Sequence, residues 1–374
     1  MLRAVIVGGG IGGLTTAFAL RRAGLEVVVL EKAGELREIG AGISIWVNAV
    51  EALERMGLAD AVQAAGREEI EAEIRTSDGA TLSRLPLGKR FGRNVILTRS
   101  ALQRVLLAAL EEAGVPVRTG AECVGFKQDG FGVVAFLSDG EERGDLLVGA
   151  DGLNSVIRRR LFGDERPRYA GFTAWRGMVD LEHHDEAFEA WGRGSVFGLA
   201  GLGRGHFYWY ATRNAPEGQA DSQAGRKAEL LERFGGWHEP VPAVILATEE
   251  AEILRHDIYD REPLKRWGEG RVTLLGDAAH PMIPNLGQGA CQAIEDAAVL
   301  AECLRGGTDV VRALRLYEGR RMGRTAWIAR RSRLLGRVSQ LENPLLCAAR
   351  NAAVRAMPPR LQMRHLGAVL TNER

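Results

Sequence analysis

The chain has 374 residues, of which 46% are hydrophobic and 26% charged, a balance typical of a globular protein with room for two closely joined domains. The net charge of +1 and the lack of any apolar run of about 18 residues predict no nucleic-acid partner and no membrane span. The four cysteines (Cys123, Cys291, Cys303 and Cys347) have no CxxC spacing, which argues against a disulfide framework or a metal site and favours the cytoplasm.

The first thirty residues predict a β-α-β unit, the building block of a parallel sheet. Residues 3–7 are β-rich, Ile11–Ala23 has helical apolar spacing, and Val27–Leu30 is a second buried strand. Helical patterns then recur, and three strand-like runs follow them. These predicted elements are helices at 48–65 and 100–113 and strands at 121–127, 131–137 and 146–150.

The section from 170 to 260 has a different character. Gly171–Leu181 and His206–Thr212 predict strands rich in aromatic residues, with glycine-rich loops between them. We interpret this section as a separate sheet inserted into the first domain. The β-rich run Val272–Leu275 returns to that domain, and long helices are expected from 289 onward.

The strongest local signal is the glycine-rich turn between the first strand and the first helix. Its spacing is Gly8-x-Gly10-x-x-Gly13, with Ile11 and Gly12 at the start of the helix. The first glycine permits a tight turn, the second lets a pyrophosphate approach the backbone, and the third brings helix and strand together. The free N–H groups of the helix favour a diphosphate at this place.

An acid follows the second strand of the same unit. Glu31 lies 18 residues after Gly13, where a carboxylate accepts hydrogen bonds from a ribose, and Lys32 follows it. The unit therefore predicts a bound dinucleotide. A carboxylate would repel a 2′-phosphate, which disfavours NADP in this pocket and leaves NAD and FAD.

Two later segments favour FAD over NAD. The segment 150–158 follows a predicted strand and contains Asp151 and Arg158. In the segment 275–290 a strand ends in Asp277, an acid suited to a ribitol hydroxyl, and a glycine-rich turn then opens another helix.

With these three motifs in this order, residues 1–330 resemble the aromatic-hydroxylase (group A) flavoprotein monooxygenases, which have the para-hydroxybenzoate hydroxylase fold. The stretch from Ile253–Asp260 through Asp296 is especially similar to the zeaxanthin-epoxidase, urate-hydroxylase and hydroxybenzoate-hydroxylase branches. The resemblance implies an α/β fold: a Rossmann-like FAD-binding domain, an interleaved β-rich substrate domain and C-terminal helices. We place the FAD-binding domain at 1–70, 98–168 and 263–330, the substrate domain at 71–97 and 169–262, and a helical tail at 331–374.

The resemblance also implies which residues bind FAD. They are Gly8, Gly10, Ile11, Gly12, Gly13, Glu31, Lys32, Ser44, Arg99, Gln103, Val124, Asp151, Arg158, Asp277, Pro284, Gly287, Gln288, Gly289 and Ala290. In the family pattern Ser44 of the segment 40–44 lies along the cofactor, Arg99 and Gln103 contact its phosphates and ribitol, and residues 287–290 surround the isoalloxazine. Val124 meets the adenine through its backbone. The alternatives are a surface arginine at a helix start for Arg99 and a solvated basic turn for Arg158.

In such enzymes NADH or NADPH binds transiently, reduces the flavin and leaves, and O₂ then forms a C4a-hydroperoxyflavin with an electrophilic terminal oxygen. The resemblance thus implies an NAD(P)H- and FAD-dependent monooxygenase that hydroxylates a small aromatic or heteroaromatic substrate, as a monomer or dimer. The alternative is an epoxidase or a flavin-dependent reductase of a larger apolar substrate on the same fold. We interpret His280 as a packed loop histidine rather than a proton shuttle.

Candidate substrate contacts come from the inserted sheet. Alternation along 206–210 places Tyr208 on the face opposite Phe207 and Trp209. Hydroxylation of a phenol is helped by a group that takes its proton, so Tyr208 is predicted as a catalytic-site contact and Arg176 as a partner for an anionic substrate. The alternative is that the aromatic residues only pack the sheet and that Arg176 pairs with a neighbouring acid.

One departure from the family pattern concerns the substrate. Val196 lies near the place where urate-type hydroxylases have a clamping arginine, which argues against urate.

The C-terminal region is basic, with 14 Arg and 3 Glu in residues 311–374. We favour a helical tail whose arginines are solvated or pair with earlier acids, because no aromatic residue follows Trp327. The alternative is contact with an anionic partner or a membrane. In that case residues 345–370 would form an amphipathic helix with an apolar side of Leu345, Leu346, Ala349, Ala353 and Met357.

Overall fold

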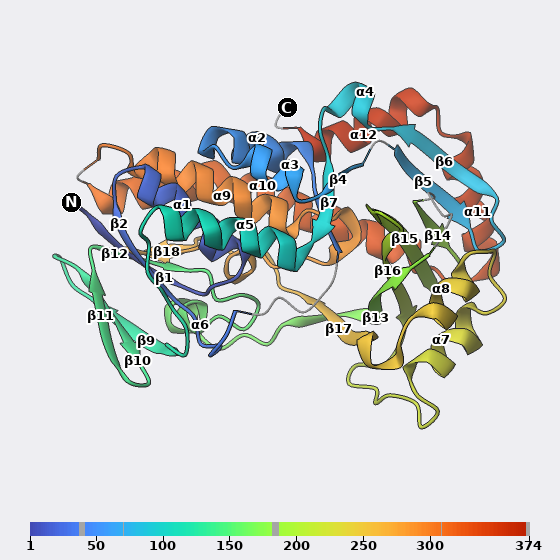
Figure 1. Ribbon diagram of the computed structural model, residues 1–374, viewed down its shortest axis with the longest axis horizontal. Coiled ribbons are helices and arrows are strands. Elements are labelled where there is room, and N and C mark those ends of the chain that lie inside the picture. Colours follow the sequence, from blue (N-terminus) through green and yellow to red (C-terminus); the bar gives the residue numbers. More distant parts are fainter. Residues whose placement is uncertain (37–41, 70, 182–186, 308, 372–374) are drawn as a thin grey trace.

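A computed structural model describes residues 1–36, 42–69, 71–181, 187–307 and 309–371 of the chain. Gly40 and Ala41, part of the segment predicted along the cofactor, lie outside these residues. Two large sheets lie side by side along the long axis of the molecule, and the chain passes between them several times (Figure 1). Among the described residues, no helix combines the length and the apolar character that a bilayer span requires.

The first large sheet has the strand order β18-β19-β12-β1-β2-β8, and its strands are parallel except for β18. Its central strands are nearly all apolar because both faces of the sheet are covered. The strands are β1 (Arg3–Val7), β2 (Glu26–Leu30), β8 (Val117–Arg118), β12 (Leu146–Gly149), β18 (Gly268–Glu269) and β19 (Val272–Leu274).

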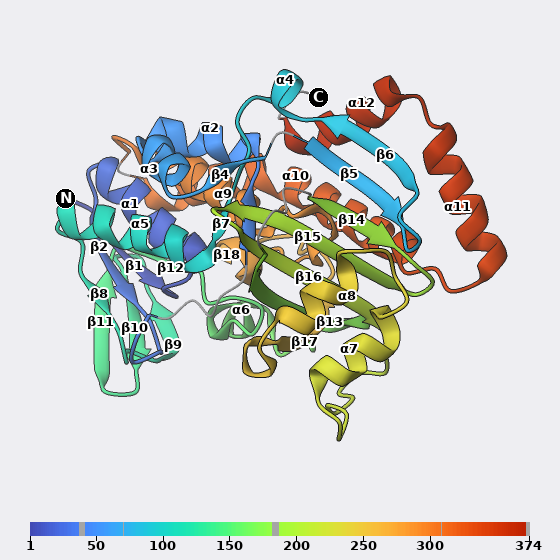
Figure 2. The same cartoon turned by 45° about the vertical axis from the view of Figure 1, so that its right-hand side comes forward.

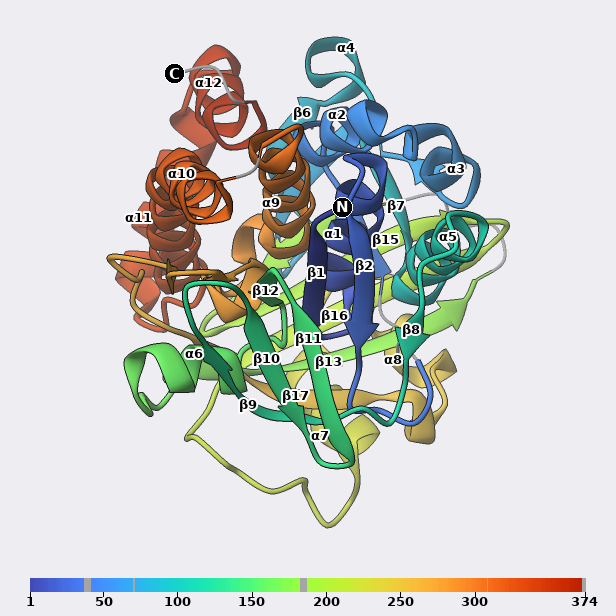
Figure 3. The same cartoon turned by 90° about the vertical axis from the view of Figure 1, so that its left-hand side faces the viewer.

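Helices cover one face of this sheet and a small antiparallel sheet covers the other (Figure 3). The helices are α1 (Ile11–Arg22), α5 (Arg99–Glu112), α9 (Gly289–Leu304) and, packed on α9, α10 (Val310–Ser339). The antiparallel strands are β9 (Cys123–Gln128), β10 (Val133–Leu137) and β11 (Gly140–Gly144).

The second large sheet has the order β17-β13-β16-β15-β14-β5-β6 and is antiparallel except between β14 and β5. One face packs on α7 (Arg226–Phe234) and α8 (Val241–Ala247) around the buried rings of Trp175, Phe197 and Trp209. The strands are β5 (Glu71–Thr76), β6 (Thr81–Pro86), β13 (Arg168–Asp180), β14 (Phe188–Trp191), β15 (Ser195–Gly203), β16 (His206–Asn214) and β17 (Leu254–Asp260).

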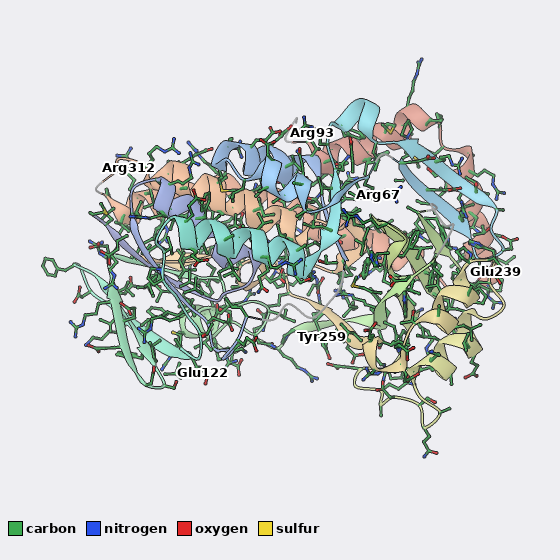
Figure 4. All side chains as sticks on the ribbon, viewed as in Figure 1. Arg67, Arg93, Glu122, Glu239, Tyr259 and Arg312 are labelled. Atoms are coloured by element: carbon green, nitrogen blue, oxygen red, sulfur yellow. The ribbon has the colours of Figure 1, made fainter. Side chains whose placement is uncertain are left out.

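A third, small sheet joins the two large ones. It has the order β3 (Gly42–Ile45), β7 (Val95–Thr98) and β4 (Arg67–Glu68). From β4 the Arg67 side chain extends over β15, where its Nη1 atom lies 2.6 Å from the position of a Cβ added at Gly201 (Figure 4).

The other helices are α2 (Val47–Met56), α3 (Ala59–Ala64), α4 (Gly88–Phe91), α6 (Val156–Phe162), α11 (Pro344–Ala356) and α12 (Pro359–Leu370), with short 3₁₀ turns at Glu250–Glu252, Gly276–Ala278 and Pro284–Leu286.

The predicted β-α-β unit, the strands at 121–150 and the inserted aromatic-rich strands are confirmed. The helical pattern over 48–65 is confirmed as two helices, α2 and α3, because Gly57 adopts a left-handed conformation (φ 78°) that ends α2. The single helix expected over 345–370 is wrong: Pro358 and Pro359 separate α11 from α12.

Candidate active site

The three motif glycines of the first turn have different surroundings. Gly8 has a positive φ of 113°, and a Cβ there would lie 2.3 Å from the Ala150 carbonyl oxygen. A Cβ at Gly13 would lie 1.9 Å from the Gly8 carbonyl oxygen, whereas no atom of the described residues lies within 4 Å of a Cβ at Gly10. Gly8 and Gly13 therefore allow close backbone packing, and Gly10 leaves an open approach that fits a diphosphate.

Glu31 is held beside this turn. Its carboxylate accepts hydrogen bonds from the Gly9 N–H (2.6 Å) and the Ala33 N–H (2.9 Å). Lys32 next to it is exposed, and Ile11 and Gly12 form the first turn of α1. Val124, predicted at the adenine, is 48% exposed on β9.

The loop between β19 and α9, residues 275–288, supplies the second part of the site, and we call it the Asp277 loop. Burial raises the pKa of Asp277, against the opposing charges of His280 and Arg99, and yet the Asp277 side chain is exposed. A carboxylate surrounded by protein but open to solvent is suited to a hydroxyl of a ligand. A Cβ at Gly289 would lie 3.9 Å from Asp277 Oδ1, so the first turn of α9, which includes Ala290, begins close to this carboxylate.

Pro284 and Gly287 of the same loop are exposed, as a ligand-facing loop requires. Gln288 differs: it is 1% exposed, and its amide bonds with Asn48 and accepts a hydrogen bond from Gln292 (2.9 Å). The Gln288 side chain thus points into the protein, and its backbone is the part left for a flavin.

Arg99 and Gln103 lie about one turn apart at the start of α5. Arg99 is half-buried and close to both Asp277 and Tyr208. Its positive charge partly opposes the rise in pKa that burial causes in each of them. This position favours the predicted site arginine over the alternative of a surface arginine. Gln103 is 6% exposed, and Ser44 on β3 is half-buried.

Asp151, in the loop after β12, and Arg158, on α6, hold neighbouring backbone in place. Arg158 is 3% exposed and donates through Nη1 to the carbonyl oxygens of Ala278 and Ala279 (3.2 Å each), so the alternative of a solvated turn is wrong. Asp151 accepts hydrogen bonds from Ser155 Oγ (2.5 Å) and the Val156 N–H (2.7 Å), which caps α6. A direct contact of either side chain with the cofactor stays a prediction.

Beneath the Asp277 loop lies a buried charge network that sequence reasoning missed. Asp296 Oδ2 lies 2.6 Å from His280 Nε2 and accepts the Gly276 N–H (3.2 Å). Arg321 donates to Asp296 Oδ1 (2.6 Å) and Glu295 Oε2 (2.5 Å). Burial opposes ionisation of Asp296, but the charges of His280 and Arg321 hold its pKa below the ordinary value. His280 is a packed loop histidine, 3% exposed.

The second sheet turns a polar face toward this loop. Phe207 and Trp209 are buried against α7 and α8, which confirms the predicted alternation, and Tyr208 lies on the opposite face. Its ring contacts β3, because a Cβ at Gly42 would lie 2.5 Å from it. Burial raises the pKa of Tyr208, and the charges of Arg176 and Arg99 act in the opposite direction.

Arg176 lies in the same face, opposite Tyr210 in the β13–β16 pairing. Within the described part of the chain, no hydrogen bond or ion pair joins the Arg176 guanidinium or the Tyr208 hydroxyl to another residue, so the alternative of an Arg176–acid pair finds no partner there. Tyr210, by contrast, donates its hydroxyl to Glu189, which also accepts the Trp191 Nε1–H (2.5 Å).

Glu69 is a further acid on this side that the sequence did not indicate. Burial raises its pKa to about 7, against the hydrogen bond from Ser44, and its charge acts on Tyr210. Its Oε2 atom is buried, and no described residue bonds to it. No periodicity or motif marks Glu69, because it follows β4 and the packing of β4 against β15 of the second sheet brings it there.

A dinucleotide turn, a carboxylate at a helix-opening loop and a polar sheet face opposite them define a flavoprotein oxidoreductase. The chain belongs to the FAD binding domain family, whose model matches residues 1–331. It is 43% identical to aurachin C monooxygenase/isomerase of Stigmatella aurantiaca, over 95% of this chain and 94% of that protein. It is 38% identical to the chloroplastic zeaxanthin epoxidase of Oryza sativa, over 92% of this chain and 56% of that protein.

Among solved structures, Klebsiella pneumoniae HpxO complexed with FAD and uric acid has a TM-score of 0.91 at 30% identity, covering 99% of this chain and 96% of that one. The chain is accordingly an FAD-dependent monooxygenase with the predicted α/β fold.

Proposed function

We propose that this monooxygenase uses NADH or NADPH and O₂ to hydroxylate a small aromatic or heteroaromatic compound bound between the Tyr208 face of the second sheet and the Asp277 loop. The observation that carries the proposal is the pair of polar groups, the Arg176 guanidinium and the Tyr208 hydroxyl, that face this loop without a hydrogen-bonding partner among the described residues. FAD, when bound, supplies the oxygen-transfer chemistry.

The residues of the chain would position the substrate and its proton. Arg176 would hold a phenolate or carboxylate oxygen through charge-assisted hydrogen bonds, and Tyr208 would bond to a second polar atom. Glu69, with a pKa of about 7, is suited to take the proton of a phenol near neutral pH. Val196 is 2% exposed within an apolar cluster, which supports the proposal that urate is not the substrate.

The experiment is oxidation of NADH and of NADPH by the purified, FAD-loaded protein across a panel of phenols and heteroaromatic compounds that includes aurachin C and urate. We expect particular compounds to stimulate the oxidation of NADH or NADPH and to yield a product one oxygen atom heavier. In an experiment under ¹⁸O₂, this added oxygen should be ¹⁸O. A protein that cannot be loaded with FAD, or oxidation that yields only hydrogen peroxide throughout the panel, would contradict the proposal.

The likeness to zeaxanthin epoxidase supports a second candidate, epoxidation of a larger apolar substrate. An alkene that stimulates oxidation and yields an epoxide, while no phenol does so, would favour it. A product formed without oxygen uptake would indicate a reductase instead.

Replacing Arg176 by Met should raise KM for the substrate by about 10- to 100-fold, since a hydrogen bond to a charged group is lost, and should leave FAD affinity unchanged. Steady-state kinetics and flavin titration measure the two effects. Arg143→Met, at an exposed arginine of β11, is the matched control. An unchanged KM in the Arg176 variant would show that Arg176 does not bind the substrate.

Replacing Glu69 by Gln should flatten the pH profile. In the native enzyme the substrate-stimulated rate should rise as pH passes through about 7, where Glu69 loses its proton, and the variant should lack this rise and be slower at pH 8 by about 100-fold. The exposed neighbour Glu68→Gln is the control.

The raised pKa of Glu69 also makes the stability of the folded protein depend on pH. A carboxyl whose pKa is raised in the folded state, here from 4.5 to about 7, contributes stability that is present below pH 4.5 and lost as pH rises through 7. Glu69→Gln should therefore gain Tm relative to the native protein at pH 8 but not at pH 4. Equal pH dependence of Tm in both proteins would show that Glu69 titrates normally.

A further inference from the structure

Helix α11 is held against the protein by one side only. Cys347 and Arg350 are 6% exposed, and Val354 packs into a cluster with Trp191 and Leu335. Arg350 donates through Nη1 to the Ser339 carbonyl oxygen (2.9 Å) and through Nη2 to that of Gly192 (3.2 Å). These bonds fix which side of α11 faces inward.

The opposite side of α11, the side predicted from sequence as apolar, faces outward. Leu345 is 79% and Leu346 is 53% exposed. We call this side the outer face of α11; its other exposed residues are Ala348, Ala349, Ala352, Ala353 and Ala356. Figure 2 shows α11 at the edge of the molecule, beyond β5 and β6. A solvent-facing helix side ordinarily carries polar residues, so the outer face of α11 has the character of a surface with a partner.

Exposed positive charges lie on α11 and on α12, the helix that follows it. Arg355 on α11 and Arg360 and Arg364 on α12 are exposed, and Leu361 between the last two is 41% exposed. The sequence has no Asp or Glu from Asn343 to Thr371. Asp78, on the turn between β5 and β6, is near enough to Arg355 for the arginine charge to contribute to its lowered pKa, so Arg360 and Arg364 carry most of the positive charge of this region. The nearest preceding acid, Glu342, accepts a hydrogen bond from Asn214 Nδ2 (2.9 Å).

We propose that the outer face of α11 docks on a lipid bilayer that carries anionic headgroups. Apolar side chains set into the interface beside arginines that meet acidic headgroups supply the two signals that stable peripheral binding requires. A second copy of the chain fits less well, because a symmetric contact through this face would bring the same arginines of both copies together. This inference is independent of the substrate proposed above.

The experiment is sedimentation of the full, FAD-loaded chain with vesicles of phosphatidylcholine alone and with about one-third phosphatidylserine. We expect binding to the anionic vesicles, weaker binding to the neutral ones, and release at high salt. Two variants, Leu345→Gln/Leu346→Gln and Arg355→Gln/Arg360→Gln/Arg364→Gln, should each bind about 10-fold or more weakly. All five side chains are exposed, so both variants should keep the native Tm and flavin spectrum.

Phe131→Gln is the control, because Phe131 is 90% exposed on the turn between β9 and β10, at the other end of the molecule (Figure 1). Lack of binding to anionic vesicles, or binding that the α11 variants retain, would overturn the proposal. A native dimer that Leu345→Gln/Leu346→Gln dissociates, without vesicle binding, would assign the outer face to a second copy. If the vesicles do not bind but an acidic protein binds through this face, the partner of the outer face of α11 is that protein and not a bilayer.

Discussion

Replacing Gly13 by alanine is expected to prevent the FAD-binding part from folding, whereas the same change at Gly10 should leave the fold intact and abolish tight FAD binding. The Cβ at Gly13 would lie 1.9 Å from the Gly8 carbonyl oxygen, and this oxygen cannot move away without opening the β1–α1 turn. Such a backbone clash costs at least about 3 kcal/mol. None of the described residues has an atom within 4 Å of a Cβ at Gly10, so we expect the added methyl to obstruct an approaching diphosphate and not the fold.

Two measurements separate these effects. Thermal unfolding of the FAD-free proteins should show a native Tm for Gly10→Ala and no cooperative transition for Gly13→Ala. Flavin titration should show FAD affinity reduced about 100-fold or more for Gly10→Ala, since a methyl group would hold the diphosphate away from the helix N–H groups. A Gly10→Ala protein with native FAD affinity would move the diphosphate away from this turn. A Gly13→Ala protein with native stability would contradict the packing argument.

Replacing Arg321 by methionine should destabilise the protein by about 3–5 kcal/mol, because the change removes the guanidinium that pairs with the buried carboxylates of both Glu295 and Asp296. FAD affinity should fall as well, since Asp296 also bonds the Gly276 N–H and His280 at the start of the Asp277 loop. Chemical denaturation and flavin titration measure the two effects. The neighbour Arg320→Met is the control, because Arg320 is 51% exposed and 3.7 Å from Glu302.

The pH dependence of this variant has a defined sign. In the native protein the pKa of Asp296 is held low, so its stabilising contribution is present above the ordinary pKa of 3.8 and lost as pH falls through the lower folded-state value. Without Arg321 the buried carboxyl should have a raised pKa, and the destabilisation of the variant should shrink as pH falls from 7 to 5. Adding Glu295→Gln and Asp296→Asn should recover part of the lost stability. A destabilisation below about 1 kcal/mol would show that water screens these carboxylates.

The site contains two kinds of residue, those that local sequence spacing predicts and those that only distant contacts bring into place. Gly8, Gly10, Gly13 and Glu31 occur within one β-α-β unit, whose conformation depends on neighbours in the sequence, so spacing alone predicts their arrangement. Tyr208 could be assigned to a face for the same reason, since strand alternation is local. The domain boundaries and the cofactor contacts of individual side chains stay predictions.

Glu69 and Arg321 could not be found in this way. Glu69 enters the site because β4, which precedes it, packs against β15 of the second sheet and because Ser44 of β3 bonds to it. Arg321 lies 25 residues from the carboxylate of Asp296 that it neutralises. Among the described residues, neither side chain has a hydrogen-bonding partner within one turn or one hairpin, so no periodic pattern indicates its role.

Helix α11 shows the same division within one element. Periodicity alone identified its apolar side, because side chains three and four positions apart share a face of any helix. Only the tertiary structure decided that this side faces outward: Arg350 on the other side donates to carbonyl oxygens at the end of α10 and, far away in the sequence, at Gly192 after β14. The sequence thus determined the local units and their cofactor turn, whereas contacts between distant segments decided which side chains face the substrate, the protein interior and the surroundings.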